Sequence, residues 1–386
     1  MKSCCVIGLG YIGLPTAALI ANNGLRVYGF DNNENVVNKI NSGFVHIKEK
    51  NLPNLINEVV QGGFLTAHKS IMKSDVFIIA VPTPFASTKG KIPKPNLDYV
   101  KAAAISISKV IEKGNLVIIE STSPVGTTEE VASIIEQNAN LNKSDFSIAY
   151  CPERVIPGNI LEELVTNDRV IGGLNSLSSE KAKEFYSIFS SGKLLITDSK
   201  TAELVKLSEN AFRDVNIAFA NELSIISSNL GINVSELIKI ANHHPRVNIL
   251  KPGCGVGGHC IAVDPWFIAS QDPDNSNLIQ TSRLVNENKS SWVAQKINYH
   301  HLEFYKKNKY KPKVGLLGLT FKPNIEDIRG APAINIFKKC QELNIEIYPC
   351  EPNLISLNQI KLYTLEQVLE NCDLIFILVA HDEFKN

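Results

Sequence analysis

Residues 4–31 read CCVIGLGYIGLPTAALIANNGLRVYGFD, and this segment carries the clearest indication of the fold class. It begins as a β-branched strand at Cys4–Ile7 and ends as another at Arg26–Phe30, with a helical pattern at Leu14–Asn22 between them. The first strand leads into the helix through three glycines with the spacing GxGxxG, which are Gly8, Gly10 and Gly13. A turn of this spacing between a strand and a helix is typical of the first unit of a doubly wound α/β domain. We therefore predict a Rossmann-like domain at this end of the chain.

The same turn predicts a dinucleotide cofactor. Its first glycine permits a tight turn, the second lets the backbone approach a pyrophosphate, and the third allows the helix and the strand to pack closely. Asp31 ends the second strand, 23 residues after Gly8. A carboxylate there accepts hydrogen bonds from the adenosine ribose and repels a 2′-phosphate. The sequence therefore favours NAD over NADP, and the alternative is a glycine turn that binds no ligand.

Two loops after predicted strands carry further candidate contacts to the cofactor. The loop VPTP contains Thr83 and follows the strand predicted at Val76–Val81, and the loop ESTSP contains Thr122 and follows the strand predicted at Leu116–Glu120. Ligands of open α/β sheets bind beyond the carboxyl ends of the strands. We therefore expect both threonines to contact the cofactor; the alternative is that the prolines beside them only fix two turns.

The strand and helix patterns divide the chain into three regions. Further strands of the N-terminal sheet are predicted at Phe146–Tyr150 and Arg169–Ile171. Helical periodicity then replaces the strand pattern, at Ala202–Leu230, Val234–Ala241 and Leu278–Ile297. Strands resume at Lys313–Leu317, Glu346–Pro349 and Asp373–Val379. We predict an α/β domain that binds NAD at 1–197, a central helical domain at 198–300 and a second α/β domain at 301–386.

The C-terminal strands repeat features of the N-terminal unit. The run VIGLG at 6–10 corresponds to VGLLG at 314–318, and Asp31 corresponds to Glu351 at the end of a later strand. This echo predicts that the C-terminal domain is also Rossmann-like and has a related topology.

The composition excludes several classes of function. The 386 residues include 39 Lys and Arg against 39 Asp and Glu, which gives no global field to attract nucleic acid or an anionic membrane. No apolar run reaches the roughly 18 residues of a membrane span, and the N-terminus has no signal-peptide pattern. The eight cysteines show neither CxxC pairs nor the spacing of zinc ligands. We therefore expect no metal site and a reduced, cytoplasmic protein.

One cysteine lies in a loop suited to chemistry. Residues 253–260 read GCGVGGHC and lie between two helical patterns. A lone cysteine is most often a small apolar side chain. Backbone N–H groups of the loop, with Lys206 or Arg246 close by, would instead favour a reactive thiolate at Cys260. Lys206 and Asn210 lie four residues apart, so one helix face presents both side chains, unless they form only a solvated polar stripe.

Eight motifs follow one another along almost the whole sequence. They are GLGYIGLPTA at 8–17, AVPTPF at 80–85, ESTSPVGTTE at 120–129, YCPERVIPGNILEELVTNDRVIGG at 150–173, TAELVKLSENAFRDVNIAFANEL at 201–223, INVSELIKIANHHPRVNIL at 232–250, GVGGHCIAVDPWFI at 255–268 and GLTFKPNIEDIRGAPA at 318–333. With these motifs the chain resembles the UDP-glucose/UDP-N-acetylmannosamine dehydrogenase family. The resemblance implies a polysaccharide-biosynthesis enzyme that oxidises the C6 alcohol of a UDP-sugar to a carboxylate with NAD, and a C-terminal domain that binds UDP.

The resemblance also implies a role for each matching residue. Cys260 would be the nucleophile and Asp264 its partner. Lys206 and Asn210 would stabilise the oxyanion, and Glu153 would position the hydrolytic water. The implied contacts to the UDP-sugar are Arg154, Val155, Lys206, Asn210, Arg213, His244, Arg246, Gly257, Phe321 and Lys322. The implied contacts to NAD are Gly8, Gly10, Tyr11, Ile12, Gly13, Asp31, Thr83, Thr122 and Arg329.

The motifs CPERVIPG and HHPRVN favour the branch of this family that acts on UDP-N-acetyl-D-mannosamine. UDP-GlcNAc and UDP-glucose are the alternative substrates, and a scaffold that binds NAD without turnover is the alternative of a different class. The long helix predicted at 202–230 suggests a homodimer, in which the resemblance implies that Arg246 reaches the substrate of the partner subunit.

Of the departures from the family pattern, two have consequences for binding or rigidity. Gly330 replaces a residue with a side chain, so we expect less rigidity there. Relatives continue past a DHxxFK-like segment to a strand with a lysine that contacts UDP, whereas this sequence ends at Asn386. We therefore expect a shortened UDP-binding domain and weakened binding of UDP.

Overall fold

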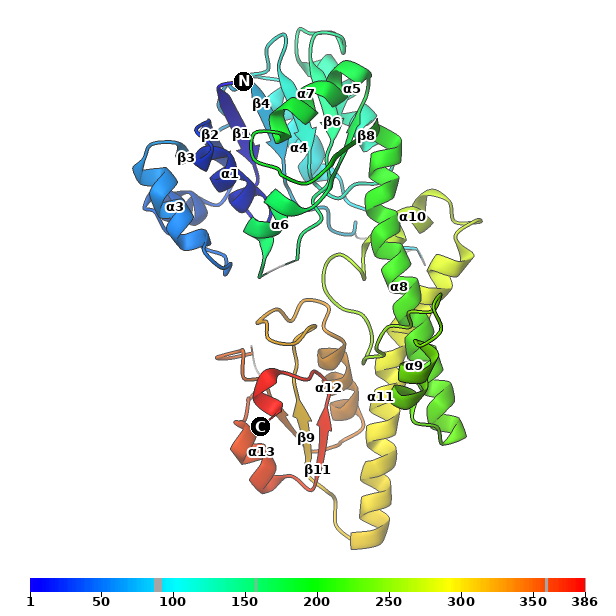
Figure 1. Cartoon of the computed structure of the whole chain (residues 1–386). Helices are drawn as coiled ribbons and strands as arrows, with labels where there is room; N and C mark the ends of the chain where they lie inside the picture. Colours follow the sequence, from blue (N-terminus) through cyan, green and yellow to red (C-terminus); the bar gives the residue numbers. More distant parts are fainter. Residues whose placement is uncertain (87–91, 157, 358–359, 386) are drawn as a thin grey trace. The chain divides into compact units, whose positions relative to one another are not determined.

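A computed structural model describes residues 1–86, 92–156, 158–357 and 360–385. The chain divides into two compact units, Met1–Leu207 and Ser208–Asn386, whose elements are labelled in Figure 1. The boundary between the units falls inside one long helix, α8 (Ser199–Leu230). Within the described ranges, no helix combines the length and the apolar character needed to cross a membrane.

The first unit is built on one sheet, whose described strands follow the order β3-β2-β1-β4-β5-β6-β7-β8. Their bounds are β1 (Ser3–Ile7), β2 (Arg26–Phe30), β3 (Leu65–His68), β4 (Val76–Ile79), β5 (Leu116–Ile119), β6 (Ser147–Tyr150), β7 (Arg169–Gly173) and β8 (Leu194–Asp198). The predicted parallel arrangement holds from β3 to β6, but β7 pairs with β6 in the antiparallel direction. The connection between them contains the short helix α6 (Ile160–Thr166), which packs against Leu19 of α1 (Gly13–Asn22) and brings the chain back in the opposite direction.

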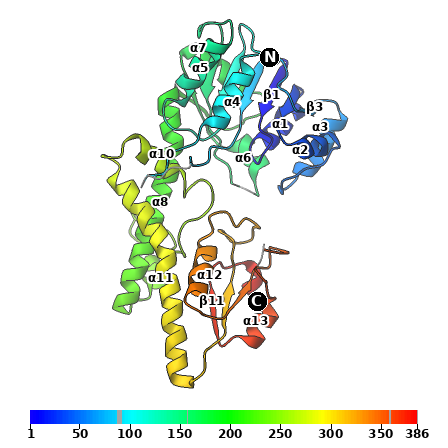
Figure 2. The ribbon, with the colours of Figure 1, turned by 180° about the vertical axis from the view of Figure 1, so that it is seen from behind.

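Helices cover both faces of this sheet (Figures 1 and 2). They are α1 (Gly13–Asn22), α2 (Glu34–Asn41), α3 (Leu52–Gln61), α4 (Asp98–Ile107), α5 (Thr127–Asn138) and α7 (Ser176–Tyr186). Successive side chains of a strand point to opposite faces. In β1, Cys4 and Val6 therefore join the apolar core under α1, α3 and α7, whereas Cys5 and Ile7 join the core under α4 and α5. Burial on both faces explains why these strands read as continuous apolar runs.

Two strands of this sheet, β3 and β8, lie at its edges and are not predicted by the sequence pattern. β3 reads LTAH. In β8, Leu195 and Ile196 are 45% and 43% exposed. Edge strands are short and half solvated, so their apolar pattern is weak.

The second unit begins with long helices. α8 and α11 (Asn277–Asn308) lie side by side in both views, and α9 (Val234–Ala241) and α10 (Asp264–Gln271) connect them (Figures 1 and 2). A buried ion pair joins the two long helices, with the Arg283 Nη1 atom 2.7 Å from Asp214 Oδ1. The prediction ended at Ile297, whereas α11 continues to Asn308. Most side chains of its last turns are exposed, including Leu302 and Tyr305, so the sequence there has no regular apolar face to mark the helix.

A parallel three-stranded sheet completes the second unit. Its order is β10 (Ile347–Cys350), β9 (Val314–Leu317) and β11 (Leu374–Ile377), and it is accompanied by α12 (Pro332–Glu342), α13 (Leu365–Asn371) and the 3₁₀ turn η1 (Asp382–Phe384). This order matches β2-β1-β4 of the first unit. The turns match as well: the Gly8 N–H donates to the Phe30 carbonyl at 2.8 Å, and the Gly318 N–H donates to the Cys350 carbonyl at 2.9 Å. The predicted echo between the two ends of the chain is confirmed.

Candidate active site

Three glycines form the turn between β1 and α1, and two of them have no room for a side chain. Gly8 has φ +93°, and a Cβ atom there would lie 2.7 Å from the Ala80 carbonyl oxygen. At Gly13 a Cβ atom would lie 1.9 Å from the Gly8 carbonyl oxygen, so α1 begins directly against the turn. Around Gly10, no described heavy atom lies within 4 Å of the Cβ position. The backbone at this glycine is therefore open to close approach by a ligand.

Asp31 is held beside this turn at the end of β2. Its carboxylate accepts the Leu9 N–H at 3.1 Å and the Asn33 N–H at 2.9 Å. The side chain is half-buried, and a carboxylate has lone pairs beyond these two bonds. Tyr11, which is 41% exposed, and Ile12, the N-cap of α1, complete the turn. These residues fit NAD: the N-terminus of α1 would hold the pyrophosphate, and Asp31 would accept hydrogen bonds from the ribose.

The two threonines predicted to contact the cofactor lie together. The Thr83 hydroxyl donates to the Thr122 carbonyl at 2.7 Å, which joins the loop after β4 to the loop after β5. Both residues are half-buried at the carboxyl end of the sheet, the same edge that carries the glycine turn. The tertiary structure thus collects the predicted cofactor residues of the first unit at one edge.

Lys206 and Glu153 form a nearly buried pair in the first unit. The Lys206 Nζ atom donates to the Glu153 carbonyl at 2.9 Å and to its Oε1 atom at 3.1 Å, and the two side chains are only 7% and 10% exposed. The other carboxylate oxygen of Glu153 accepts the Val155 N–H at 2.9 Å. One cation and one carboxylate are thus positioned by the loop after β6 and by the first turns of α8.

Asn210 and Asp264 form the corresponding pair in the second unit. The Asn210 side-chain amide donates to Asp264 Oδ2, and Asp264 is 2% exposed at the start of α10. The Asp264 N–H donates to the Cys260 carbonyl at 2.9 Å. Cys260 itself is an exposed thiol. The structure therefore brings the predicted nucleophile, its acidic partner and one predicted oxyanion donor into one cluster.

The glycine-rich loop that leads to Cys260 packs against the segment after β9. A Cβ atom on Gly257 would lie 2.6 Å from the Gly330 carbonyl oxygen and 2.9 Å from the Phe321 Cβ atom. The Gly258 N–H donates to the Arg329 carbonyl at 3.1 Å. Gly330 has φ +61°, a conformation in which glycine is unstrained. The loop is therefore in contact with a segment that carries Phe321, a predicted UDP contact, and Arg329, a predicted NAD contact.

The carboxylate of Asp327 holds the guanidinium group of Arg329. The Arg329 Nε atom donates to Asp327 Oδ1 at 2.9 Å and to Oδ2 at 3.0 Å, and the Nη2 atom donates to Oδ2 at 2.6 Å. Burial raises the pKa of Asp327, but the hydrogen bonds from Arg329 outweigh it, so this pKa lies below its ordinary value. Asp327 was not predicted, although it belongs to the motif that contains Arg329.

The remaining predicted cations and the predicted histidine of the second unit are exposed; these are Arg213, His244, Arg246 and Lys322.

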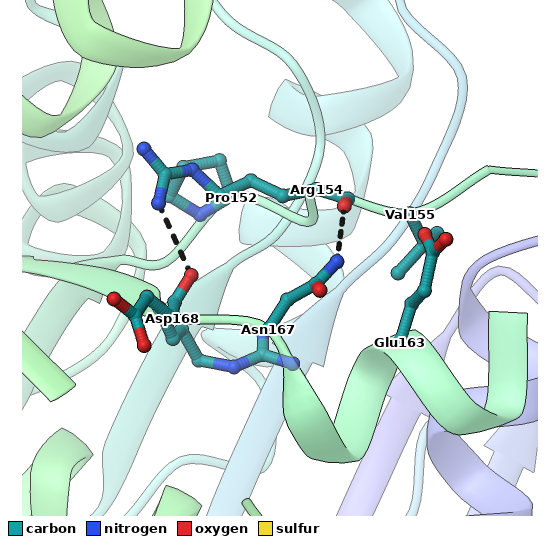
Figure 3. Close-up of a pocket in the computed structure, with 7 residues that line it drawn as sticks. Pro152, Arg154, Val155, Glu163, Asn167 and Asp168 are labelled. Atoms are coloured by element: carbon teal, nitrogen blue, oxygen red, sulfur yellow. Dashed lines mark hydrogen bonds between the residues drawn. The ribbon is translucent and has the colours of Figure 1, made fainter. Parts of the chain in front are cut away.

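A small pocket lies beside Arg154 (Figure 3). It encloses about 10 Å³, roughly the space of one water molecule. The Arg154 Nη1 atom donates to the Asp168 carbonyl at 3.1 Å, and the Asn167 amide donates to the Arg154 carbonyl at 2.8 Å. The segment with Arg154 and Val155, both predicted UDP-sugar contacts, is thus tied to the turn before β7.

Sequence reasoning also missed a carboxylate that supports this segment. Glu49 is 6% exposed and accepts the Gly158 N–H at 2.8 Å and the Ile160 N–H at 3.0 Å. It thereby caps the start of α6 from a loop more than 100 residues away in the sequence. No motif or spacing marks Glu49, because its role depends only on the tertiary contact.

The fold and the glycine turn place the chain among the dehydrogenases that bind NAD in a Rossmann-like domain. Three consecutive family models match it: UDP-glucose/GDP-mannose dehydrogenase family, NAD binding domain, at residues 2–190; central domain, at 200–288; and UDP binding domain, at 315–386. The chain belongs to the UDP-glucose/GDP-mannose dehydrogenase family. This confirms the resemblance, the fold class, the enzyme class and NAD as the predicted cofactor.

Several named relatives are similar over most of their length. A UDP-N-acetyl-D-mannosamine dehydrogenase of Campylobacter jejuni is 51% identical, over 98% of this chain and 95% of the relative. The enzyme of the same name from Escherichia coli K12 is 47% identical, over 98% and 94%. Among solved structures, a UDP-D-ManNAc dehydrogenase from Pyrococcus horikoshii is 39% identical with a TM-score of 0.91, over 100% of this chain and 91% of that one.

Proposed function

We propose that the protein oxidises UDP-N-acetyl-D-mannosamine at C6 to UDP-N-acetyl-D-mannosaminuronate. The observation that carries this proposal is the 51% identity, over 98% of the chain, to the Campylobacter jejuni enzyme named for that sugar. Two features of the molecule support it: the glycine turn with Asp31 fits NAD, and Asp264 is bonded both to the Cys260 carbonyl, through its N–H, and to the Asn210 amide, through its carboxylate.

The reaction removes two hydrides from one carbon, and NAD, when bound, accepts each of them. After the alcohol has lost a hydride and a proton, the Cys260 thiolate attacks C6 of the aldehyde and forms a C–S bond, while an electron pair moves to the oxygen. Loss of the second hydride from this thiohemiacetal gives a thioester. Water then attacks the thioester, the C–S bond breaks, and the carboxylate and the thiol are released.

Negative charge develops on the C6 oxygen at each step that involves the cysteine, so donors must surround that oxygen. We assign this task to the Lys206 ammonium and the Asn210 amide, which lie one turn apart on α8. Glu153, whose carboxylate holds Lys206, is assigned to position the hydrolytic water. Asp264 is assigned as the partner of Cys260.

The other assignments follow the family motifs and are part of the same proposal. The UDP-sugar is assigned to Arg154, Val155, Arg213, His244, Arg246, Gly257, Phe321 and Lys322. NAD is assigned to Tyr11, Ile12, Asp31, Thr83, Thr122 and Arg329, together with the glycine turn. We keep the domain limits 1–197, 198–300 and 301–386 as a proposal, and we propose a cytoplasmic location because all eight cysteines are thiols.

A substrate panel tests the proposal. The purified protein is incubated with NAD and, separately, with UDP-N-acetyl-D-mannosamine, UDP-GlcNAc and UDP-glucose, and NADH formation and the acid product are measured. We expect the highest kcat/KM for UDP-N-acetyl-D-mannosamine, with two NADH per acid formed. A higher value for another sugar would reassign the substrate. Binding of NAD without NADH formation from any of the three sugars would instead indicate a non-catalytic scaffold.

We further propose that the protein is a homodimer. Four apolar side chains at helical spacing form an exposed stripe along α8: Phe212 at 72%, Phe219 at 55%, Ile226 at 46% and Leu230 at 67% exposure. A stripe of this size on one helix supports a two-fold contact with the same stripe of a second copy, in which Arg246 reaches the partner's substrate. Light scattering should show a dimer for the wild type and a monomer for Phe219→Glu; a monomeric wild type would contradict the proposal.

A further inference from the structure

The acidic residue that ends the second strand of each glycine turn is held in the same way in both units. Each carboxylate accepts the N–H of the residue after the turn's first glycine, at 3.1 Å for Asp31 and 2.7 Å for Glu351. Each also accepts the N–H two residues further along its own chain, at 2.9 Å for Asp31 and 3.0 Å for Glu351. Asp31 is half-buried, whereas Glu351 is 3% exposed. The two equivalent carboxylates therefore face different surroundings.

The group that covers Glu351 is the imidazole of His381. Its Nε2 atom lies 2.9 Å from Glu351 Oε2, and the His381 side chain is fully buried. Its Nδ1 atom accepts the Asn324 N–H at 2.9 Å. Because a backbone N–H can only donate, Nδ1 carries the lone pair and Nε2 carries the proton that Glu351 accepts. The imidazole bonds the same oxygen that accepts the Leu319 N–H, and Glu351 is only 3% exposed, so this carboxylate is covered by protein groups and is not open to a ribose.

The bond from Asn324 links His381 to the loop that follows β9. Asn324 has φ +60°, a left-handed conformation that costs a non-glycine residue energy and must be held by its surroundings. Two further bonds hold it: the Asn324 amide donates to Asp382 Oδ2 at 2.7 Å, and the Asp382 N–H donates to Asn324 Oδ1 at 3.0 Å. The same loop carries Phe321 and Lys322.

We propose that His381 is a positioning residue for the UDP part of the substrate. Its bond to Glu351 keeps the ring proton on Nε2, so Nδ1 remains an acceptor and holds the backbone N–H of Asn324, and Phe321 and Lys322 are thereby presented in a defined geometry. His381 itself is buried and does not touch the substrate. This inference rests on the proposed function, because the assignment of those two residues to UDP belongs to it.

Two substitutions separate the two ring nitrogens. In His381→Asn, the side-chain oxygen lies where Nδ1 was and still accepts the Asn324 N–H, but the side chain is too short to reach Glu351. In His381→Gln, the longer amide reaches Glu351 but leaves no acceptor at the Nδ1 position. The readouts are the dissociation constant of UDP by calorimetry, the KM for the UDP-sugar, the KM for NAD and kcat.

We expect His381→Gln to weaken UDP binding and to raise the KM for the UDP-sugar about ten-fold, because the contacts of Nδ1 with the Asn324 N–H and with the Asn353 amide are both lost. We expect His381→Asn to stay within about three-fold of the wild type, with kcat and the KM for NAD little changed in both variants. A residue that merely fills space and pairs with Glu351 gives the reverse order, with glutamine better tolerated than asparagine. That order, or equal UDP binding by all forms, would overturn the inference.

Two more variants complete the test. Glu383→Gln changes an exposed residue of the same segment and should leave UDP binding unchanged. Asp382→Ala, also at an exposed position, removes a second link to Asn324 without opening the core, and it decides the question if both His381 variants fail to fold. An unchanged dissociation constant in Asp382→Ala would then overturn the inference. If the wild type binds UDP but oxidises no UDP-sugar, the proposed function is wrong. The role of His381 is then still tested by the dissociation constants of UDP in the variants.

Discussion

Glu351 should control the stability of the second unit at acid pH. Burial raises the pKa of this carboxyl, but the hydrogen bonds from His381 and from the backbone N–H groups of Leu319 and Asn353 outweigh burial and lower the pKa from 4.5 to about 2. A carboxyl whose pKa is lower in the folded state stabilises that state above its unfolded pKa. The stabilisation is therefore complete above about pH 4.5 and is lost as the pH falls toward about 2.

The size of the effect follows from the two pKa values. Each tenfold change in proton affinity corresponds to about 1.4 kcal/mol, so the Glu351 carboxylate contributes about 3 kcal/mol at neutral pH. At about pH 3 roughly 1.4 kcal/mol of this remains, because the folded form is still mostly ionised there. Glu351→Gln keeps an acceptor for the backbone N–H groups but has no proton to gain. The difference in unfolding free energy between wild type and variant should therefore narrow by about 2 kcal/mol between about pH 6 and about pH 3.

The assay is urea unfolding at a series of pH values, followed by tryptophan fluorescence. The chain has two tryptophans, Trp266 and Trp292, and both lie in the second unit, so the signal reports the unit that contains Glu351. Glu342→Gln, at an exposed position of α12, serves as the matched control and should follow the wild type at every pH. A constant difference in unfolding free energy between wild type and Glu351→Gln over this pH range would show that the Glu351 carboxylate does not stabilise the second unit in this way.

Three further predictions concern the reaction. Cys260→Ser should still allow the first hydride transfer but should nearly stop formation of the acid, because serine lacks an accessible anion. We expect at most about one NADH per bound sugar. Normal acid production by this variant would show that Cys260 is only a packing residue. Asp31→Ala should narrow the preference for NAD over NADP, since the carboxylate no longer repels a 2′-phosphate; an unchanged ratio of kcat/KM values would show that the ribose is read elsewhere. Mixing inactive Cys260→Ala and Arg246→Ala chains should restore part of the activity if Arg246 serves the partner's site, and no recovery in proven heterodimers would speak against it.

The cofactor half of the protein could be predicted from the sequence because its determinants are local. The three glycines, the helix that follows them and Asp31 lie within one strand–helix–strand unit, so their spacing alone implies the turn. The same holds for Lys206 and Asn210, which share a face of α8 because they lie four residues apart on one helix. The correspondence of Glu351 to Asp31 could be predicted as well, because the glycine turn and the acidic residue after the second strand repeat a local pattern.

What each of these side chains contacts was decided by tertiary structure. Lys206 is hydrogen-bonded to Glu153, 53 residues away in the sequence, and Asn210 is hydrogen-bonded to Asp264, 54 residues away. No periodicity of the sequence relates positions so far apart. Glu351 shows the difference most clearly: it follows the second strand of its unit, as a residue that reads a ribose does, yet His381, 30 residues further on, covers it and lowers its pKa. A local pattern determines the backbone conformation of a turn, but only the packing of distant segments determines whether the carboxylate beside that turn faces a ligand or a buried imidazole.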